Sequence, residues 1–157
     1  MATIGKLPFW KVPHYFAGQY IGAFLAACYV YGSYFEAIQT YDQGHRVPWF
    51  SPELYNASFV SFATGGIFST YPAVWMTSYG ALIDQLLATF TFVFGICIIT
   101  NPKNKLPYHL QPLLIGLTLC AMIISFGLNC GAILNPARDI SPRLFQLIGG
   151  YGINSFT

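Results

Sequence analysis

Residues Gly131 to Phe145 read GAILNPARDISPRLF, and they are the most informative part of the sequence for its fold. Asn is a favoured helix N-cap and Pro is favoured at the first helical position, so Asn135-Pro136 predicts the start of a helix. The amphipathic segment that follows, to about Leu147, is too short to cross a bilayer. It comes directly after an apolar run at about 110–130. We therefore expect a re-entrant half-helix over about 135–147, with an ordinary capped surface helix as the alternative.

The N-terminus of this half-helix is expected to lie at membrane depth. Irregular backbone is tolerated there only against protein or a water-filled cavity. Free N–H groups and the helix dipole give such an end a positive potential of about half a charge, which repels cations and attracts oxygen lone pairs. Arg138 adds a full charge one turn away, and an intramembrane Arg is a functional-site candidate. Arg138 and this helix end are therefore a candidate functional site.

The composition extends the membrane prediction to the rest of the chain. Only 8% of the residues are charged, against about a quarter in soluble domains, and 55% are hydrophobic. The apolar residues form uninterrupted blocks instead of the three-and-four spacing of a soluble helix. The sequence predicts one transmembrane domain over 1–157, with membrane spans at about 13–37, 80–100 and 110–130. A polar turn at 101–107 separates the last two spans.

Several classes of function are excluded by what the residues lack. A net charge of +2 without a basic block gives no hold on nucleic-acid phosphates. No CxxC or zinc-type spacing joins the cysteines, and no helix face joins the histidines, so we expect no metal and no cofactor; these residues are Cys28, Cys97, Cys120, Cys130, His14, His45 and His109. No pairing of nucleophile and base and no phosphate-binding loop appears, which argues against an enzyme.

Basic residues predict the orientation. Lysines precede the first span and occupy the turn between the second and third, so the positive-inside rule places these segments in the cytoplasm and residues 38–79 outside. Asn56 begins an N-glycosylation sequon, Asn-Ala-Ser, within that outer segment. We expect it to be a possible glycosylation site.

The stretch from Gly131 to Phe145 resembles the second Asn-Pro-Ala loop and half-helix of an aquaglyceroporin, in the major intrinsic protein family. Other segments resemble the family in order and spacing. Met1–Pro13 resembles the stretch just after the family's first Asn-Pro-Ala, Phe68–Pro72 resembles its outer loop, and Asp84-Gln85 resembles the start of its fourth span. The resemblance implies an all-α membrane protein with an aquaporin-like inverted-repeat bundle. It also implies an incomplete copy, truncated at both ends, with three full spans plus the half-helix.

The glycerol-conducting branch is indicated by four positions. Asp139 directly after Arg138, with Arg143 four residues on, resembles that branch, and the spacing also predicts a helical ion pair that keeps the half-helix mouth open. Ala132 stands where many members place a larger residue at the constriction, which would widen the filter. Ile123 replaces the His of water-selective members, although its bulk leaves the width open.

By the same resemblance, the pore residues fall into two groups. The Asn135 amide and Arg138 would donate hydrogen bonds to a solute, beside Pro136 and Ala137. Backbone carbonyls would accept them from solute hydroxyls, at Gly131, Ala132, Ile133 and Leu134. The side chains of Ile133 and Leu134 can equally pack in the core or against lipid.

A buried acid supports the loop in this interpretation. Asp84 lies within the second span, and in relatives an acid there accepts backbone N–H bonds of the re-entrant loop. Loop amides at membrane depth need such acceptors. A simple interface position near the outer end of the span is the alternative.

The sequence thus predicts a passive channel for glycerol and small polyols, with water, in the lipid bilayer, in particular the plasma membrane. Family members pack as homotetramers, so we expect the same of a complete channel. Two alternatives stay open: a water-selective pore, and a non-conducting truncated subunit that associates with a longer channel.

Overall fold

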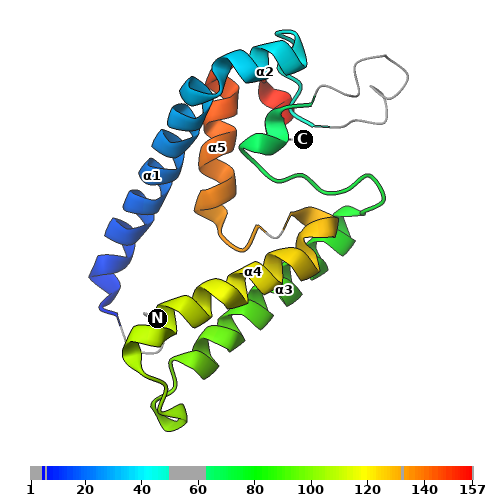
Figure 1. The fold of residues 1–157 in the computed structure, drawn as a ribbon. Coiled ribbons are helices and arrows are strands. Elements are labelled where there is room, and N and C mark those ends of the chain that lie inside the picture. Colours follow the sequence, from blue (N-terminus) through cyan, green and yellow to red (C-terminus); the bar gives the residue numbers. More distant parts are fainter. Residues whose placement is uncertain (1–4, 6, 50–62, 132, 157) are drawn as a thin grey trace. The chain divides into compact units, whose positions relative to one another are not determined.

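The computed structural model describes residues 5, 7–49, 63–131 and 133–156. Their regular structure is helical, with one isolated β-bridge between Val47 and Ala63. The α-helices, labelled in Figure 1, are α1 (Val12–Ser33), α2 (Phe35–Asp42), α3 (Ser78–Ile99), α4 (Gln111–Cys130) and α5 (Pro136–Ile148). Short 3-10 helices cover Phe9–Lys11, Gly65–Ile67, Pro102–Asn104, Tyr108–Leu110 and Ile153–Phe156.

Two helical segments, α3 and Tyr108–Cys130, are long and apolar enough to cross a membrane. A third span is possible where α1 and α2 meet at a bend of 72°. At Tyr34 the backbone leaves the helical region, with φ −111° and ψ 14°. The first helix therefore ends at Ser33, whereas the sequence pattern led us to expect it to continue to about residue 37.

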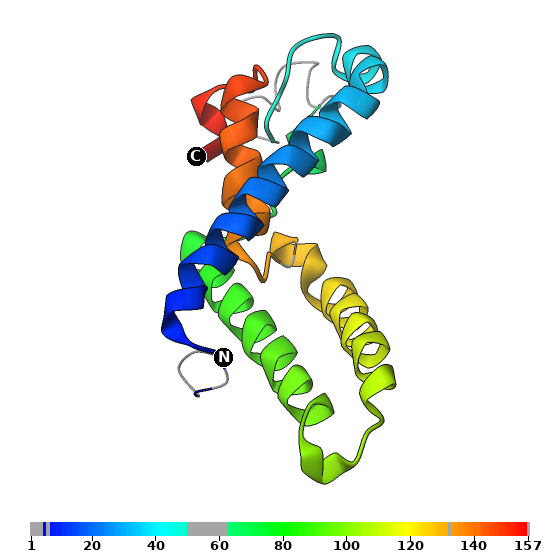
Figure 2. The same ribbon diagram turned by 90° about the vertical axis from the view of Figure 1, so that its left-hand side faces the viewer.

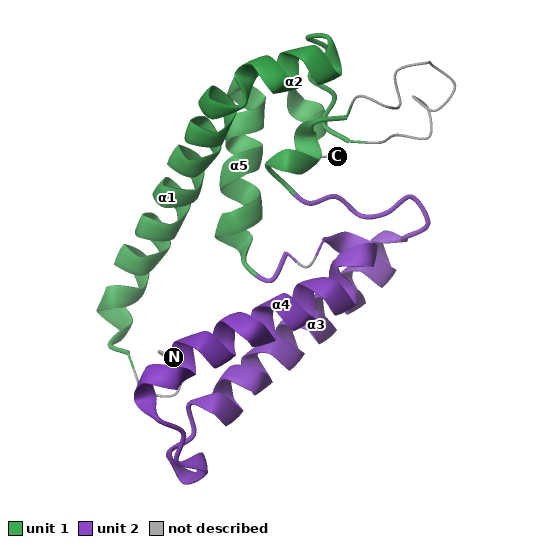
Figure 3. Ribbon diagram, viewed as in Figure 1, with its two compact units in different colours: residues 1–69, 135–157 green, residues 70–134 purple. Residues whose placement is uncertain are grey.

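The chain divides into two compact units (Figure 3). The first contains residues 1–69 and 135–157, and the second contains residues 70–134. In the second unit α3 and α4 lie side by side as a helical hairpin (Figure 2). The Thr77 hydroxyl caps α3, and Asn101 caps the turn that follows it. The expectation of a single domain over 1–157 stays a prediction.

The first unit is built around the pairing of α1 with α5, which lie side by side (Figures 1 and 2). Its buried hydrophobic cluster joins residues that are far apart in the sequence: Ala27, Ile38, Phe68, Phe145 and Tyr151. The core of this unit therefore depends on the half-helix α5 packing against the first long helix.

The segment at residues 64–69 is tied to its neighbours by backbone and side-chain bonds. The buried Gln146 amide donates to the Gly65 carbonyl at 2.7 Å, and the Ser69 hydroxyl donates to the Asp139 carbonyl at 3.5 Å. Gly65 also lies so close to Pro48 that an added Cβ would be 2.5 Å from its carbonyl carbon. Only glycine fits there without a backbone shift.

Candidate pore site

The half-helix α5 begins where the sequence predicts. Asn135 has an extended backbone, with φ −144° and ψ 115°, and its Oδ1 accepts the Ala137 N–H at 3.0 Å. Pro136 is the first helical residue. The cap uses the oxygen of the Asn135 side chain, which leaves the Nδ2 group for other partners. One of these partners is the Oε1 atom of Gln19 on α1, at 3.2 Å.

The charged side chains in the first turns of α5 contact one another through Asp139. Arg143 Nε donates to Asp139 Oδ2 at 2.7 Å, which confirms the predicted i, i+4 ion pair. Arg143 also donates to the Ser155 carbonyl. Arg138 lies 3.9 Å from the other Asp139 oxygen, a longer and weaker contact, and its side chain is 45% exposed. Asp139 is thus held mainly by Arg143, and the guanidinium of Arg138 is not enclosed in that pair.

A cavity of about 460 Å³ lies in the first unit and includes the N-terminal end of α5. Its polar lining comes from Gln19, Asn135 and Arg138. The remainder is made of small or apolar side chains: Ala23, Ala26, Ala27, Val30, Ile67, Phe68, Ala137 and Pro142. The cavity therefore combines hydrogen-bonding groups near a helix N-terminus with an alanine-rich wall from α1.

The loop before the half-helix is held within the second unit. Gly131 ends α4 in the left-handed region, with φ 73°, and a Cβ there would meet the Thr70 side chain at 2.6 Å. Leu134 is also left-handed, with φ 49°. The Ile133 N–H donates to Gln85 Oε1 at 2.9 Å. Ala132 lies outside the described residues, so the row of solute-facing carbonyls stays a prediction.

Asp84 has contacts that differ from those expected. Its Oδ1 accepts from the Asn129 side chain at 2.9 Å and its Oδ2 from the Gln85 side chain at 3.3 Å. The Ile133 N–H of the loop donates to Gln85 instead. Asp84 therefore supports the loop indirectly. It accepts a hydrogen bond from the Gln85 side chain, whose Oε1 atom accepts the Ile133 N–H.

Two further expected residues remain without a test. Ile123 lies on α4 and is 48% exposed, and its part in a constriction stays a prediction. Asn56 lies outside the described residues. In the part of the chain that the structure covers, no group of three His, Cys, Asp or Glu residues is placed to hold a metal ion.

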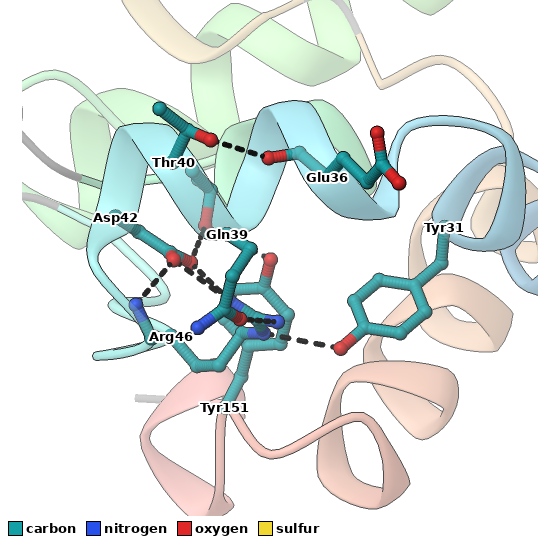
Figure 4. Close-up of polar contacts among 9 residues, drawn as sticks. Tyr31, Glu36, Gln39, Thr40, Asp42, Arg46 and Tyr151 are labelled. Carbon is teal, nitrogen blue, oxygen red and sulfur yellow. Dashed lines mark hydrogen bonds and ion pairs between the residues drawn. The ribbon is translucent and has the colours of Figure 1, made fainter.

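Sequence reasoning missed a buried polar network in the first unit, shown in Figure 4. Arg46 Nη1 donates to both oxygens of Asp42, at 2.7 and 2.8 Å, and its Nη2 donates to Gln39 Oε1 at 2.8 Å. Asp42 also accepts from the Gly44 N–H at 2.9 Å and the Thr64 hydroxyl at 3.0 Å. The i, i+4 spacing of Asp42 and Arg46 was the available signal, but spacing alone does not reveal burial.

The protonation of this network follows from its contacts. Burial lowers the pKa of Arg46, but the hydrogen bonds that Arg46 donates to Tyr31 and Asp42, together with the Asp42 charge, outweigh this effect, so the pKa is raised overall. Burial also raises the pKa of Tyr151, against an opposing hydrogen bond to Thr64. Arg46 therefore stays cationic and Tyr151 stays neutral.

Comparison with known proteins matches the whole chain to one family. The family profile described as Major intrinsic protein covers residues 1–149. Human Aquaporin-10 is 35% identical over 158 residues, and Aquaglyceroporin-2 of Rhizophagus irregularis is 39% identical over 158 residues. Each alignment covers 100% of this chain, but only 49% and 47% of the respective relative. The chain thus spans about half the length of these curated relatives.

A solved structure gives the same result for the fold. The X-ray structure of the aquaglyceroporin from Plasmodium falciparum matches with a TM-score of 0.75 at 26% identity, over 99% of this chain and 57% of that one. The membrane-length helices and the capped half-helix at Asn135 agree with that fold. This multi-pass membrane protein belongs to the major intrinsic protein family.

Proposed function

We propose that this chain forms part of a passive channel that conducts glycerol and other small neutral polyols, with water. The observation that supports this most directly is the cavity in which Asn135 and Arg138 share one space with an alanine-lined wall. Glycerol has a hydroxylated edge and a carbon edge, which suit these two kinds of lining. The name of the relative Aquaglyceroporin-2 agrees with this substrate class.

Ions are excluded in this proposal by charge. The N-terminus of α5 carries the positive end of the helix dipole, and Arg138 adds a full positive charge to it. In a low-dielectric wall these two like-signed contributions are screened less than in water. A cation or hydronium ion entering the cavity is therefore repelled, whereas a neutral solute is not.

Neutral solutes are accepted because the site replaces part of their hydration. Arg138 donates from a planar guanidinium and Asn135 donates from Nδ2. The carbonyls of Gly131, Ala132, Ile133 and Leu134 supply acceptors in this proposal, and Ile123 contributes to the width. A hydroxyl group can thus exchange water partners for protein partners as it passes.

The glycerol branch is favoured over a water-selective pore by the ion pair on α5. Arg143 contacts Asp139 at 2.7 Å, whereas Arg138 lies 3.9 Å from the same carboxylate, so Asp139 compensates the charge of Arg138 only in part. With a small residue at 132, the filter would keep its charge and gain width. Asp84 and Gln85 support the adjoining loop through the Ile133 amide.

We further propose a homotetramer in the plasma membrane as the working form. Gly18 and Gly22 on α1 are four residues apart, and an added Cβ at either would meet nothing within 4 Å. Small residues at this spacing allow close helix packing between membrane helices. Blue native electrophoresis of the protein extracted from plasma-membrane fractions tests both assignments.

The test of the channel function uses three preparations in oocytes. They are the 157-residue chain, a chimera in which the chain replaces the matching half of Aquaglyceroporin-2, and Aquaglyceroporin-2 itself as the control. A pore of this kind needs two half-helices from an inverted repeat, and the sequence holds one Asn-Pro-Ala. We therefore expect glycerol uptake and swelling with the chimera, and no flux above uninjected oocytes with the chain alone. Swelling of the chimera without glycerol uptake would identify a water-selective pore instead.

A second candidate function is a non-conducting subunit that associates with a longer channel. Co-expression of the chain with Aquaglyceroporin-2 tests it. A change in the surface level of Aquaglyceroporin-2, together with co-purification of the two chains, would support this function.

A further inference from the structure

A buried ion pair lies outside the cavity lining. Asp42 is fully buried and the Arg46 side chain is 9% exposed, and the two contact each other through both carboxylate oxygens. Gln39 accepts a hydrogen bond from Arg46 (Figure 4). The Thr64 hydroxyl donates to Asp42. Replacing such a pair by well-packed apolar residues is often neutral or stabilising, so stability alone does not account for it.

The pair is linked to an aromatic cluster through Tyr31. Arg46 Nε donates to the Tyr31 hydroxyl at 3.1 Å, and its guanidinium carbon lies 5.4 Å from the Tyr31 ring centroid. The Tyr31 ring packs in turn against Phe68, at 6.2 Å between centroids, and against Phe145, at 5.3 Å. Arg46 is thus connected to the ring of Phe68 through Tyr31.

A second route reaches Phe68 from the other partner. Asp42 accepts from Thr64, whose hydroxyl is 2.9 Å from the Tyr151 hydroxyl. The Tyr151 ring lies 5.9 Å from Phe68. Phe68 is therefore packed between rings that are each connected to the ion pair, and it is only 6% exposed.

Phe68 is also part of the cavity wall. It lines the same 460 Å³ space as Arg138 and Asn135, together with its neighbour Ile67. A shift of this ring changes the width available to a solute beside Arg138. Closely packed aromatic rings shift together because protein interiors contain few voids.

We propose that Asp42 and Arg46 are positioning residues that fix Phe68 and thereby set the largest solute that the cavity admits. This inference rests on the proposed channel function. Arg46 suits this positioning role because its planar guanidinium donates hydrogen bonds to Asp42, Gln39 and Tyr31 in fixed directions. A lysine keeps the charge but has no planar group of donors.

The first test measures solute size selectivity in the glycerol-conducting chimera. Arg46→Lys keeps the charge, and Tyr31→Phe removes only the hydroxyl that Arg46 binds. Uptake of glycerol and of a four-carbon polyol is measured per channel at the surface. Both variants should raise the four-carbon to glycerol ratio by about twofold to tenfold, the size expected for coupling through a packed network. Lys103→Met, at an exposed turn, is the control and should leave the ratio unchanged.

The second test does not require conduction. The purified 157-residue chain carries 4-fluorophenylalanine at position 68, and its fluorine NMR signal is recorded with and without Arg46→Lys. A shifted or broadened signal in the variant, absent in Lys103→Met, supports the positioning role. Signals that coincide in all three proteins would overturn it. Absence of glycerol flux in the chimera, in contrast, would overturn the proposed function and leave this readout intact.

Discussion

At the scale of single residues, Arg138 and its neighbour Asp139 have different surroundings. Asp139 is buried and its short contact is to Arg143, whereas Arg138 is partly exposed and lines the cavity. The local sequence predicted both the ion pair and the candidate role of Arg138. It could not show that the cavity also includes Gln19 from α1, more than a hundred residues earlier in the chain.

Arg138→Val should weaken charge selectivity in the glycerol-conducting chimera. The substitution removes the full charge and the guanidinium donors, while the dipole of α5 remains. We expect proton or cation leak to rise while neutral-solute flux persists or increases. Currents across a pH gradient and glycerol uptake are measured at equal surface expression. Unchanged selectivity would mean that Arg138 acts as a structural tie.

Gly65→Ala should destabilise the first unit. The new Cβ would overlap the Pro48 carbonyl group, which is backbone and cannot rotate away. Overpacking of this kind costs about 1–3 kcal/mol. The melting temperature in detergent should therefore fall by several degrees. Gly66→Ala is the matched control, since its Cβ meets nothing within 4 Å, and an equal fall in both variants would refute the steric explanation.

At the scale of elements, the re-entrant loop and the half-helix have separate supports. The half-helix is capped by its own Asn135, a local contact that the sequence predicts. The loop depends on Gln85, 48 residues before Ile133 along the chain. The sequence singled out the Asp84-Gln85 pair but assigned the loop contact to the acid, because the family resemblance implies that role for an acid at this position.

Gln85→Leu should loosen the loop before α5. The Ile133 N–H would lose its acceptor, which costs about 1 kcal/mol for a partly buried amide. Hydrogen exchange at the Ile133 amide should accelerate, and the melting temperature should fall. Gln85→Glu keeps an acceptor and should retain most of the protection. Equal exchange rates in Gln85→Leu and the unaltered protein would contradict this assignment.

At the scale of the whole molecule, distant segments meet in the polar network of the first unit. The hydroxyls of Tyr151 and Thr64, 87 residues apart in the sequence, form a hydrogen bond. The Thr64 hydroxyl also donates to Asp42. The network therefore joins α2, residues 63–64 and the segment after α5. Its integrity should depend on the protonation of Tyr151, whose pKa is raised by burial.

Stability should fall at alkaline pH through Tyr151. A raised folded-state pKa means that its contribution is fully present below the unfolded value, about 10, and is lost as pH rises through the folded value. Tyr151→Phe should lower the melting temperature at pH 8, because the Thr64 bond is lost, but flatten its decline above about pH 10. Tyr108→Phe, at a ring that is 85% exposed, is the control and should keep the original decline. A decline in Tyr151→Phe as steep as in the unaltered protein would refute the role of Tyr151.

Local sequence was sufficient to predict the membrane character, the spans near α3 and α4, the start of α5 at Asn135-Pro136 and the Asp139–Arg143 pair. These features depend on local hydropathy, capping and helical spacing, which act over a few residues. The resemblance in Gly131 to Phe145 also indicated the family that the comparisons confirm.

The break at Tyr34, the contact of Gln85 with the loop and the buried Asp42–Arg46 network became visible only in the folded chain. Each depends on which segments meet in space. Asp42 and Arg46 look like an ordinary solvated pair in the sequence, because spacing does not report burial. The packing of α1 against α5 brings Tyr31, Phe68 and Phe145 together, and this aromatic cluster adjoins the Asp42–Arg46 pair through Tyr31.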